Sequence, residues 1–163
     1  MMILGVDPGT LYGICLYDTQ RAAPVQYMAA LHANVKMLKD PEALGEQISD
    51  TATKAMFQAG EVGVFAVEIA VRGPSMAVFA AQNRMIGVII YRLKRVAPVV
   101  EVNPRHSKKA LTGNGNAKKN GMVAAADRLY PEHMLGTKAE REAKADALAH
   151  VLASLKYNLR VTR

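Results

Sequence analysis

Three runs of β-forming residues at the start of the chain constrain the fold more than any other sequence feature. They cover residues 2–6, 12–17 and 25–31, and short turn-forming or polar segments separate them. The first run ends in Asp7-Pro8-Gly9, where proline fixes φ and glycine tolerates a positive φ. Runs joined in this way are typical of an antiparallel meander of three strands.

Helix and strand patterns alternate after the meander. The expected helices cover residues 41–59, 75–96, 117–129 and 139–157, a further helix can begin at Asn103-Pro104, and the expected strands cover 62–67 and 98–102. This order predicts an α/β fold with a mixed five-stranded sheet, in which helical crossovers add two parallel strands to the meander. We expect one domain over residues 1–163, because no linker or repeat divides the chain.

Composition narrows the class of protein. Half of the residues are hydrophobic, which allows a packed core. Cys15 is the single cysteine, which excludes an intramolecular disulfide framework and is compatible with a reducing compartment. We see neither a secretory signal nor an apolar run of about 18 residues, and therefore expect a cytoplasmic protein without a membrane partner.

Positive charge is concentrated in one part of the chain. Between residues 69 and 126, ten lysines and arginines accompany a single acid, Glu101, although the whole chain has a formal net charge of only +7. Such a segment favours a polyanionic partner, because each neutralised phosphate releases condensed counterions. The alternative is a solvated basic face that serves solubility.

Three acids stand where an enzyme could use them. Asp7 ends the first strand, Glu68 ends the strand after the first helix, and Asp146 lies among alanines and leucines in the last helix. If the two strands are neighbours, Asp7 and Glu68 lie side by side at their carboxyl ends, where α/β sheets place their sites. A helix packed on that sheet can bring Asp146 to the same point.

Clustered carboxylates predict a divalent cation. Their mutual repulsion raises their pKa values unless Mg²⁺ or Mn²⁺ neutralises them. Two such ions about 4 Å apart can activate a water and stabilise the leaving oxygen of a phosphodiester. The alternative gives each acid a local role, with Asp7 capping its turn and Glu68 pairing with an arginine such as Arg72.

These residues resemble the RuvC family of Holliday-junction resolvases, in particular its shorter phage-encoded members. Residues 3–10, followed by Gly13, are similar to the family's opening strand and turn, and residues 64–68 to the strand with the second acid. Residues 108–119 resemble the family's basic segment with its Gly-x-Gly break, and residues 146–149 its C-terminal helix motif. The resemblance covers most of the chain, with all four elements in order.

The resemblance implies a ribonuclease-H-like fold and a homodimeric, Mg²⁺-dependent crossover junction endodeoxyribonuclease, for which Mn²⁺ can substitute. Its DNA partner would be a Holliday junction or another branch, cut to leave 5′-phosphate and 3′-hydroxyl ends, with no small-molecule substrate. By the same resemblance, the apolar face of helix 75–96 forms the dimer interface, for which ordinary core is the alternative. The expected location is the cytoplasm of a bacterial cell or of a phage-infected host.

The resemblance also implies roles for individual residues. Asp7, Glu68 and Asp146 are expected metal ligands, and Lys108 and Lys119 are expected to hold the strand and stabilise developing charge. The residues expected to contact DNA share a positive charge, and they are Arg72, Arg105, Lys108, Lys109, Lys118 and Lys119.

Two positions depart from the family's pattern. The family has an acid or a histidine three residues before the last aspartate, where this chain has Ala143. We predict that Glu142, four residues before Asp146 and on nearly the same helix face, serves as the fourth ligand. The alternative is a surface ion pair within residues 140–144. Val71 replaces an aromatic wedge residue, which leaves junction opening and sequence preference open.

Other roles remain compatible with the sequence. His150, four residues after Asp146, could stand behind the metal ligands or simply belong to the core. A junction-binding protein that lost cleavage through Ala143 is the main rival function. The sequence Asp-Pro-Gly-Thr at residues 7–10 also resembles the phosphate loop of actin-like ATPases and sugar kinases. Those enzymes need two such domains, which a chain of this length can scarcely supply.

Overall fold

The computed structural model describes residues 1–60, 63–71, 75–157 and 161–162. A single mixed sheet has the strand order β3-β2-β1-β4-β5-β6. The strands are β1 (Met2–Asp7), β2 (Leu11–Asp18), β3 (Ala23–His32), β4 (Val64–Glu68), β5 (Val99–Val102) and β6 (Val161–Thr162). The predicted α/β fold and antiparallel meander are confirmed, and β4 and β5 extend the sheet in parallel as expected.

The sheet has a sixth strand, whereas the sequence predicted five. β6 is two residues long and pairs antiparallel with the edge strand β5. A segment this short contains no measurable alternation of apolar and polar residues, so the pattern that identifies longer strands could not predict it.

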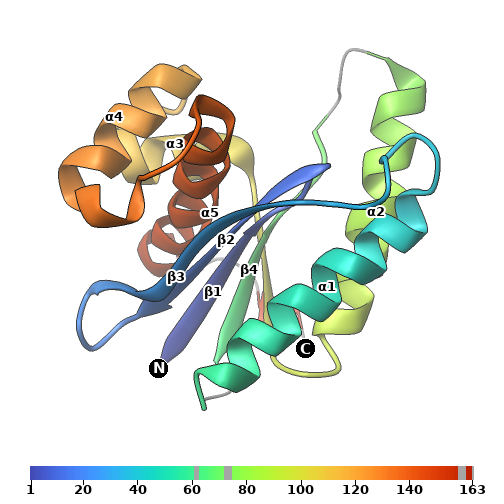
Figure 1. The fold of residues 1–163 in the computed structure, drawn as a ribbon, viewed down its shortest axis with the longest axis horizontal. Helices are drawn as coiled ribbons and strands as arrows, with labels where there is room; N and C mark the ends of the chain where they lie inside the picture. Colours follow the sequence, from blue (N-terminus) through green and yellow to red (C-terminus); the bar gives the residue numbers. More distant parts are fainter. Residues whose placement is uncertain (61–62, 72–74, 158–160, 163) are drawn as a thin grey trace.

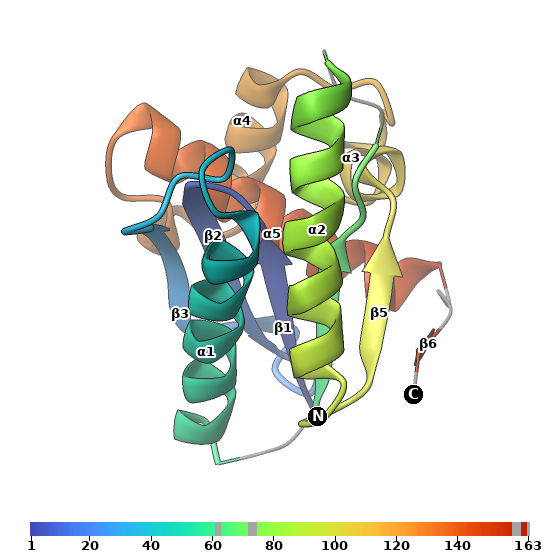
Figure 2. The same ribbon diagram turned by 90° about the vertical axis from the view of Figure 1, so that its right-hand side faces the viewer.

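Helices cover both faces of the sheet and form a three-layer molecule (Figure 1). The helices are α1 (Pro41–Gln58), α2 (Met76–Leu93), α3 (Pro104–Thr112), α4 (Lys119–Leu129) and α5 (Lys138–Lys156), with a short 3₁₀ helix, η1 (Pro131–His133), before α5. α1 and α2 lie on one face, and α3, α4 and α5 lie on the other (Figures 1 and 2). No helix among the described residues is both long and apolar enough to cross a membrane.

Alternation along β1 divides the core between the two faces. Ile3 belongs to the core under α3, α4 and α5, whereas Leu4 and Val6 belong to the core under α1 and α2. Five apolar residues of α2 also belong to this second core, among them Met85 and Ile89. The chain therefore buries both faces of its sheet, as parallel additions to a sheet require.

Local signals place the helix ends close to where the sequence predicted them. The Asp40 side chain accepts a hydrogen bond from the backbone N–H of Ala43, which caps α1. Thr137 and Glu140 form a reciprocal capping box at the start of α5. α3 ends at Gly113, whose φ of 80° is a left-handed conformation that favours glycine.

Two glycines allow α5 to lie unusually close to the sheet. A Cβ atom on Gly5 would stand 2.1 Å from the carbonyl oxygen of Ala147, and one on Gly13 would stand 2.1 Å from that of Ala143. Only glycine on the strands and small residues on the helix permit this approach. The close contact sets how far the polar residues of α5 stand from the ends of β1 and β4.

Candidate metal centre

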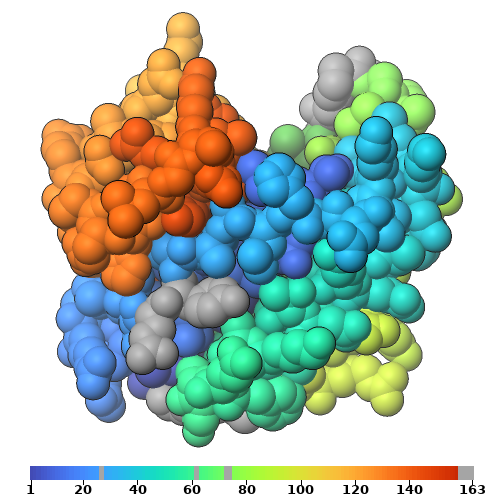
Figure 3. Space-filling view, in the orientation of Figure 1, coloured from blue at the N-terminus to red at the C-terminus, as the bar shows by residue number. Residues whose placement is uncertain are grey.

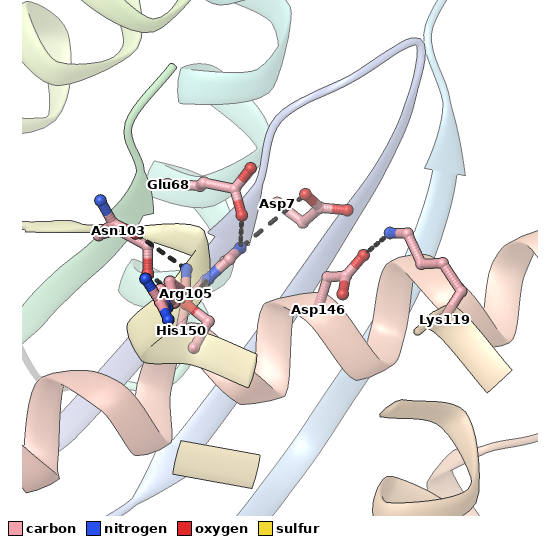
Figure 4. Close-up of polar contacts among 8 residues, drawn as sticks. Asp7, Glu68, Asn103, Arg105, Lys119, Asp146 and His150 are labelled. Atoms are coloured by element: carbon pink, nitrogen blue, oxygen red, sulfur yellow. Dashed lines mark hydrogen bonds and ion pairs between the residues drawn. The ribbon is translucent and has the colours of Figure 1, made fainter. Parts of the chain in front are cut away.

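Asp7 and Glu68 come together at the carboxyl ends of two neighbouring parallel strands. β1 and β4 pair in a register that sets Val6 opposite Val67, so the next residue on each strand is an acid. The two strands are thus neighbours, which is the condition under which the sequence places Asp7 and Glu68 side by side, at the strand ends where α/β sheets place their sites. Both carboxylates project toward the same space above α5 (Figure 4).

Asp146 approaches this space from α5. Its side chain is 10% exposed, and its Oδ2 accepts a hydrogen bond from the ammonium group of Lys119 (Figure 4). Lys119 is the first residue of α4, so the basic segment reaches the acids through the start of that helix. The structure therefore brings together the three predicted acids Asp7, Glu68 and Asp146, and Lys119 lies beside them.

His150 stands among the acids, one helical turn after Asp146. Its side chain is 1% exposed, and its Nε2 lies 3.5 Å from Oε2 of Glu68 and 3.9 Å from Oδ1 of Asp7. Its Nδ1 lies 2.8 Å from Oγ of Ser107 on α3. Asp7, Glu68 and His150 each offer one ligand atom, and these three atoms lie within 4.8 Å of one another.

Burial and mutual repulsion perturb the charges of this cluster. Burial raises the pKa of Glu68 from 4.5 to about 7, with a further rise from Asp7 and an opposing effect of His150. Burial and the charge of Asp7 likewise raise the pKa of Asp146 against the effect of Lys119. For His150, burial lowers the pKa, but Asp7 and Glu68 outweigh it and the net pKa is raised. Burial lowers the pKa of Lys119 as well, and the carboxylates, led by Asp146, reverse its effect.

These donors fit a divalent cation. Carboxylate oxygens suit Mg²⁺ and Mn²⁺, and a neutral imidazole nitrogen also binds Mn²⁺ and related metals. Nε2 of His150 is buried and has no hydrogen-bond partner, which is unfavourable in a site without a cation. A cation beside Asp7 and Glu68 would offset the repulsion between the two carboxylates and favour the ionised form of Glu68.

The structure places Glu142 away from this group. Its Oε1 lies 4.0 Å from Nζ of Lys138, and its side chain lines a hollow between α4 and α5 together with Asp127 and Arg141. The ligand group found among the described residues contains His150 instead. Glu142 is one turn before Asp146 and His150 one turn after it, so the two side chains leave α5 in different places.

The predicted DNA contacts lie around the site on α3 and at the start of α4. Arg105, Lys108 and Lys109 belong to α3, and Lys118 is the N-cap of α4. None of these four forms an ion pair with any acid in the described part of the chain, which leaves their charges available. Arg72, also predicted to contact DNA, lies outside the described residues.

The glycine break between α3 and α4 is an ordered turn. The Thr112 Oγ1 donates to the carbonyl oxygens of Lys108 and Asn114, and Oδ1 of Asn114 accepts from the backbone N–H of Asn116. A Cβ atom on Gly115 would stand 2.8 Å from Cγ of Arg105, so glycine leaves room for the arginine stem. The break therefore positions both basic helices beside the acids.

The molecular surface is hollowed next to this cluster of elements. Figure 3 shows a hollow between the orange residues of the α4–α5 side and the green start of α2, with blue residues of the N-terminal segment at its floor. The carboxyl end of β1 rises toward the same side of the molecule in Figure 1. The acids are therefore within reach of a partner that enters from this side.

Two residues that lie at the acids, His150 and its neighbour Ser107, had no predicted ligand role. His150 was expected behind the ligands or in the core, because no histidine spacing predicted a metal site. The available signal was its position four residues after Asp146, which places both on one helix face. Ser107 carried no signal, because its role depends on the packing of α3 against α5.

Comparison with known proteins identifies the family of this chain. The family model for crossover junction endodeoxyribonuclease RuvC matches residues 3–153. The chain is 30% identical to RuvC of Prochlorococcus marinus, over 95% of this chain and 98% of the relative. It is 32% identical to RuvC of a Synechococcus species, over 93% and 96% of the two chains.

A solved structure shows the same fold. Thermus thermophilus RuvC in complex with a Holliday junction substrate superposes with a TM-score of 0.75 at 18% identity, over 99% of each chain. The ribonuclease-H-like fold and the family predicted from the sequence are thereby confirmed. The chain belongs to the RuvC family of crossover junction endodeoxyribonucleases.

Proposed function

We propose that this protein is a Mg²⁺-dependent endonuclease that cleaves Holliday junctions and other branched DNA. The observation that carries the proposal is the convergence of Asp7, Glu68 and Asp146 at one edge of the sheet, with the basic helices α3 and α4 beside them. Membership of the RuvC family and the similarity to a RuvC bound to a Holliday junction support this choice of substrate. We further propose a single nuclease domain over residues 1–163 that acts in the cytoplasm.

Asp7, Glu68 and Asp146 would hold the metal. Bound divalent cations supply Lewis acidity to a water and neutralise charge on the phosphate. The protein residues align the phosphodiester so that water can add to phosphorus as the bond to the 3′ oxygen breaks. This leaves 5′-phosphate and 3′-hydroxyl ends.

The basic residues would bind and orient the DNA backbone. Arg105, Lys108, Lys109 and Lys118 lie on or between the two helices that flank the acids, and contacts of this kind position a strand without reading its sequence. Lys119 has a more direct role, because its ammonium group already stands beside Asp146. There it can stabilise negative charge that develops on the phosphate.

A homodimer formed through α2 would suit a four-way junction. The exposed stripe of α2 consists of Met76, Ala80, Asn83, Gly87 and Tyr91, and its two large apolar residues, Met76 and Tyr91, are 67% and 66% exposed. Small residues between two large apolar ones allow a second helix to approach closely. A two-fold axis through this stripe would present two copies of the acid cluster to a substrate of approximate two-fold symmetry.

The decisive experiment uses a synthetic mobile four-way junction. Wild-type protein with Mg²⁺ should produce paired nicks, and Asp7→Asn should bind the junction but cut it more than 100-fold more slowly, since even residues behind a metal ligand typically contribute about 10–100-fold. Asp50→Asn removes an acid that pairs with Arg92 on the opposite side of the sheet and should cut normally. Binding without cleavage by the wild type would instead identify a junction-binding protein. A wild type that neither binds nor cleaves the junction would contradict both functions.

A further inference from the structure

Among the described residues, His150 is the buried side chain that directs a polar atom toward the acids without a hydrogen bond. Its Nε2 has no hydrogen-bond partner, and the nearest oxygens, on Glu68 and Asp7, are 3.5 Å and 3.9 Å away. A buried polar group without a hydrogen bond is unfavourable, and both carboxylate contacts are longer than a usual hydrogen bond, so a further partner would stabilise this arrangement. A cation attracts an imidazole nitrogen and two carboxylates at once, and it would be such a partner.

The spacing of these atoms matches ligands of one cation. Ligand atoms that each stand about 2.1 Å from an ion lie roughly 3–4 Å from one another. The two measured separations from Nε2 fall in that interval. Building on the proposed metal-dependent function, we propose that His150 ligates the metal through Nε2, in the role that the sequence assigned to Glu142, and that Ser107 sets the tautomer this requires.

Ser107 can fix the proton on the opposite side of the ring. An imidazole that binds metal through Nε2 must carry its proton on Nδ1, and Nδ1 lies 2.8 Å from Oγ of Ser107. The Ser107 hydroxyl can donate in turn to the carbonyl oxygen of Asn103, at 3.5 Å. A metal-ligating histidine is commonly oriented by such a partner.

This chain of hydrogen bonds connects the metal centre to the DNA-binding surface. Ser107 belongs to α3, and it adjoins Lys108, which is predicted to contact the DNA strand. Asn103 also caps the start of α3, where its Oδ1 accepts from the backbone N–H of Arg105 (Figure 4). The position of α3 and the orientation of the His150 ring are therefore set by the same contacts.

Electron spin echo spectroscopy with Mn²⁺ as the probe tests ligation without DNA. The unmodified protein should show coupling from a directly bound ¹⁴N nucleus, and labelling its histidines with ¹⁵N should replace this coupling by that of ¹⁵N. This comparison needs no substitution, so it does not depend on whether a variant folds. The absence of nitrogen coupling in the Mn²⁺-loaded wild type would overturn the inference.

Variants then identify the histidine. His150→Gln should lose the nitrogen coupling and bind Mn²⁺ at least about 10-fold more weakly in calorimetry. His32→Gln removes an exposed histidine at the end of β3 and should retain both properties. Retention of the coupling in His150→Gln would assign the nitrogen to another residue and contradict the proposal.

Ser107→Ala tests the positioning role. Long-range ¹H–¹⁵N correlation spectra of the Mg²⁺-loaded wild type should show His150 protonated at Nδ1, and Mn²⁺ should bind the variant about 10–100-fold more weakly. An unchanged affinity and tautomer in Ser107→Ala would remove Ser107 from the proposal. A protein that binds Mn²⁺ through nitrogen but leaves junctions uncut would support this inference and contradict the proposed function. A protein that cuts junctions but shows no nitrogen ligand would support the proposed function and contradict this inference.

Discussion

At the scale of single residues, the ionisation of Glu68 couples the metal site to folding. Its folded-state pKa is raised from 4.5 to about 7, chiefly by burial. The folded chain therefore holds this proton more tightly than the unfolded chain between those two pH values. Protons bound preferentially by the folded state make the free energy of unfolding fall as pH rises. The raised pKa values of Asp146 and His150 act with the same sign.

This linkage gives a prediction for the metal-free protein. In the presence of a chelator, the melting temperature should fall as pH rises from about 4.5 to about 7.5, because the buried carboxylates must ionise without a cation. Glu68→Gln should reduce this fall, and saturating Mg²⁺ should raise the melting temperature most at the upper end. Glu142→Gln removes an acid outside the ligand group and should retain the wild-type slope. A Glu68→Gln variant with an unchanged slope would contradict the pKa assigned to Glu68.

Two adjacent lysines are expected to act on different steps. Lys119→Ala removes the ammonium group beside Asp146, and it should lower the single-turnover cleavage rate at saturating protein by about 10²-fold. Lys118→Ala removes an exposed charge that pairs with no acid among the described residues, and it should chiefly weaken junction binding and reduce the salt slope by about one. The measurements are single-turnover cleavage and binding titrations at several salt concentrations. Equal effects of both variants on the saturated rate would contradict a specific role for Lys119.

At the scale of elements, the distance between α5 and the sheet determines whether the ligands can meet. Asp146 and His150 lie on α5, whereas Asp7 and Glu68 end β1 and β4. The helix reaches the sheet because glycine stands beneath Ala143 and Ala147. Ala143, where the family's pattern has an acid or a histidine, thus lies at a close contact between α5 and β2.

Gly13→Ala should therefore disturb both stability and metal binding. The added Cβ would meet the carbonyl oxygen of Ala143 at 2.1 Å, which forces α5 away from the sheet. Overpacking of this kind typically costs about 1–3 kcal/mol in the free energy of unfolding, and the Mn²⁺ affinity should fall with it. Gly121→Ala is the matched control, because no atom lies within 4 Å of its added Cβ and helix propensity should stabilise α4 by up to about 1 kcal/mol. Denaturant unfolding measures the free energy of unfolding, and calorimetry measures the Mn²⁺ affinity. A Gly13→Ala variant in which both are unchanged would show that the α5 contact tolerates the extra methyl group and would contradict the prediction.

At the scale of the whole molecule, the distribution of exposed groups separates two surfaces. The basic residues of α3 and α4 lie on the same side of the sheet as α5, which carries two of the proposed metal ligands, whereas the exposed stripe of α2 lies on the opposite side (Figures 1 and 2). Most of the apolar face that the sequence offered for dimerisation packs instead against α1 and the sheet. The proposed dimer contact consequently rests on a narrower stripe around Gly87.

Gly87→Glu should convert the proposed dimer into a monomer. A charged side chain at the centre of the stripe would stand where a second helix must approach, and no atom of this chain lies within 4 Å of a Cβ at that position. Gln58→Glu makes the same change of charge at the exposed end of α1 and should leave the assembly unchanged. Light scattering after size-exclusion chromatography measures both masses. A wild type that is already monomeric, or a Gly87→Glu variant that remains dimeric, would contradict the α2 interface.

The sequence by itself determined the strand order along the chain, the helix caps and the two acids that end β1 and β4. These depend on local patterns, such as β-rich runs bounded by turns and the side chain of Asp40 at an N-cap, and such patterns act over a few residues. The sequence could not predict β6, which is too short to show alternation. Helical periodicity also treats Glu142 and His150 alike, because both lie one turn from Asp146. The prediction of Glu142 rested on its place next to Ala143, the position where the family has a ligand.

Only the tertiary structure distinguished those two side chains. The packing of α5 on Gly5 and Gly13 turns His150 toward Glu68, and α3 supplies Ser107 to hold its ring. Glu142 lies instead near Lys138, beside α4. The physical reason is that ligand geometry depends on distances between elements far apart in the chain, and close packing determines those distances.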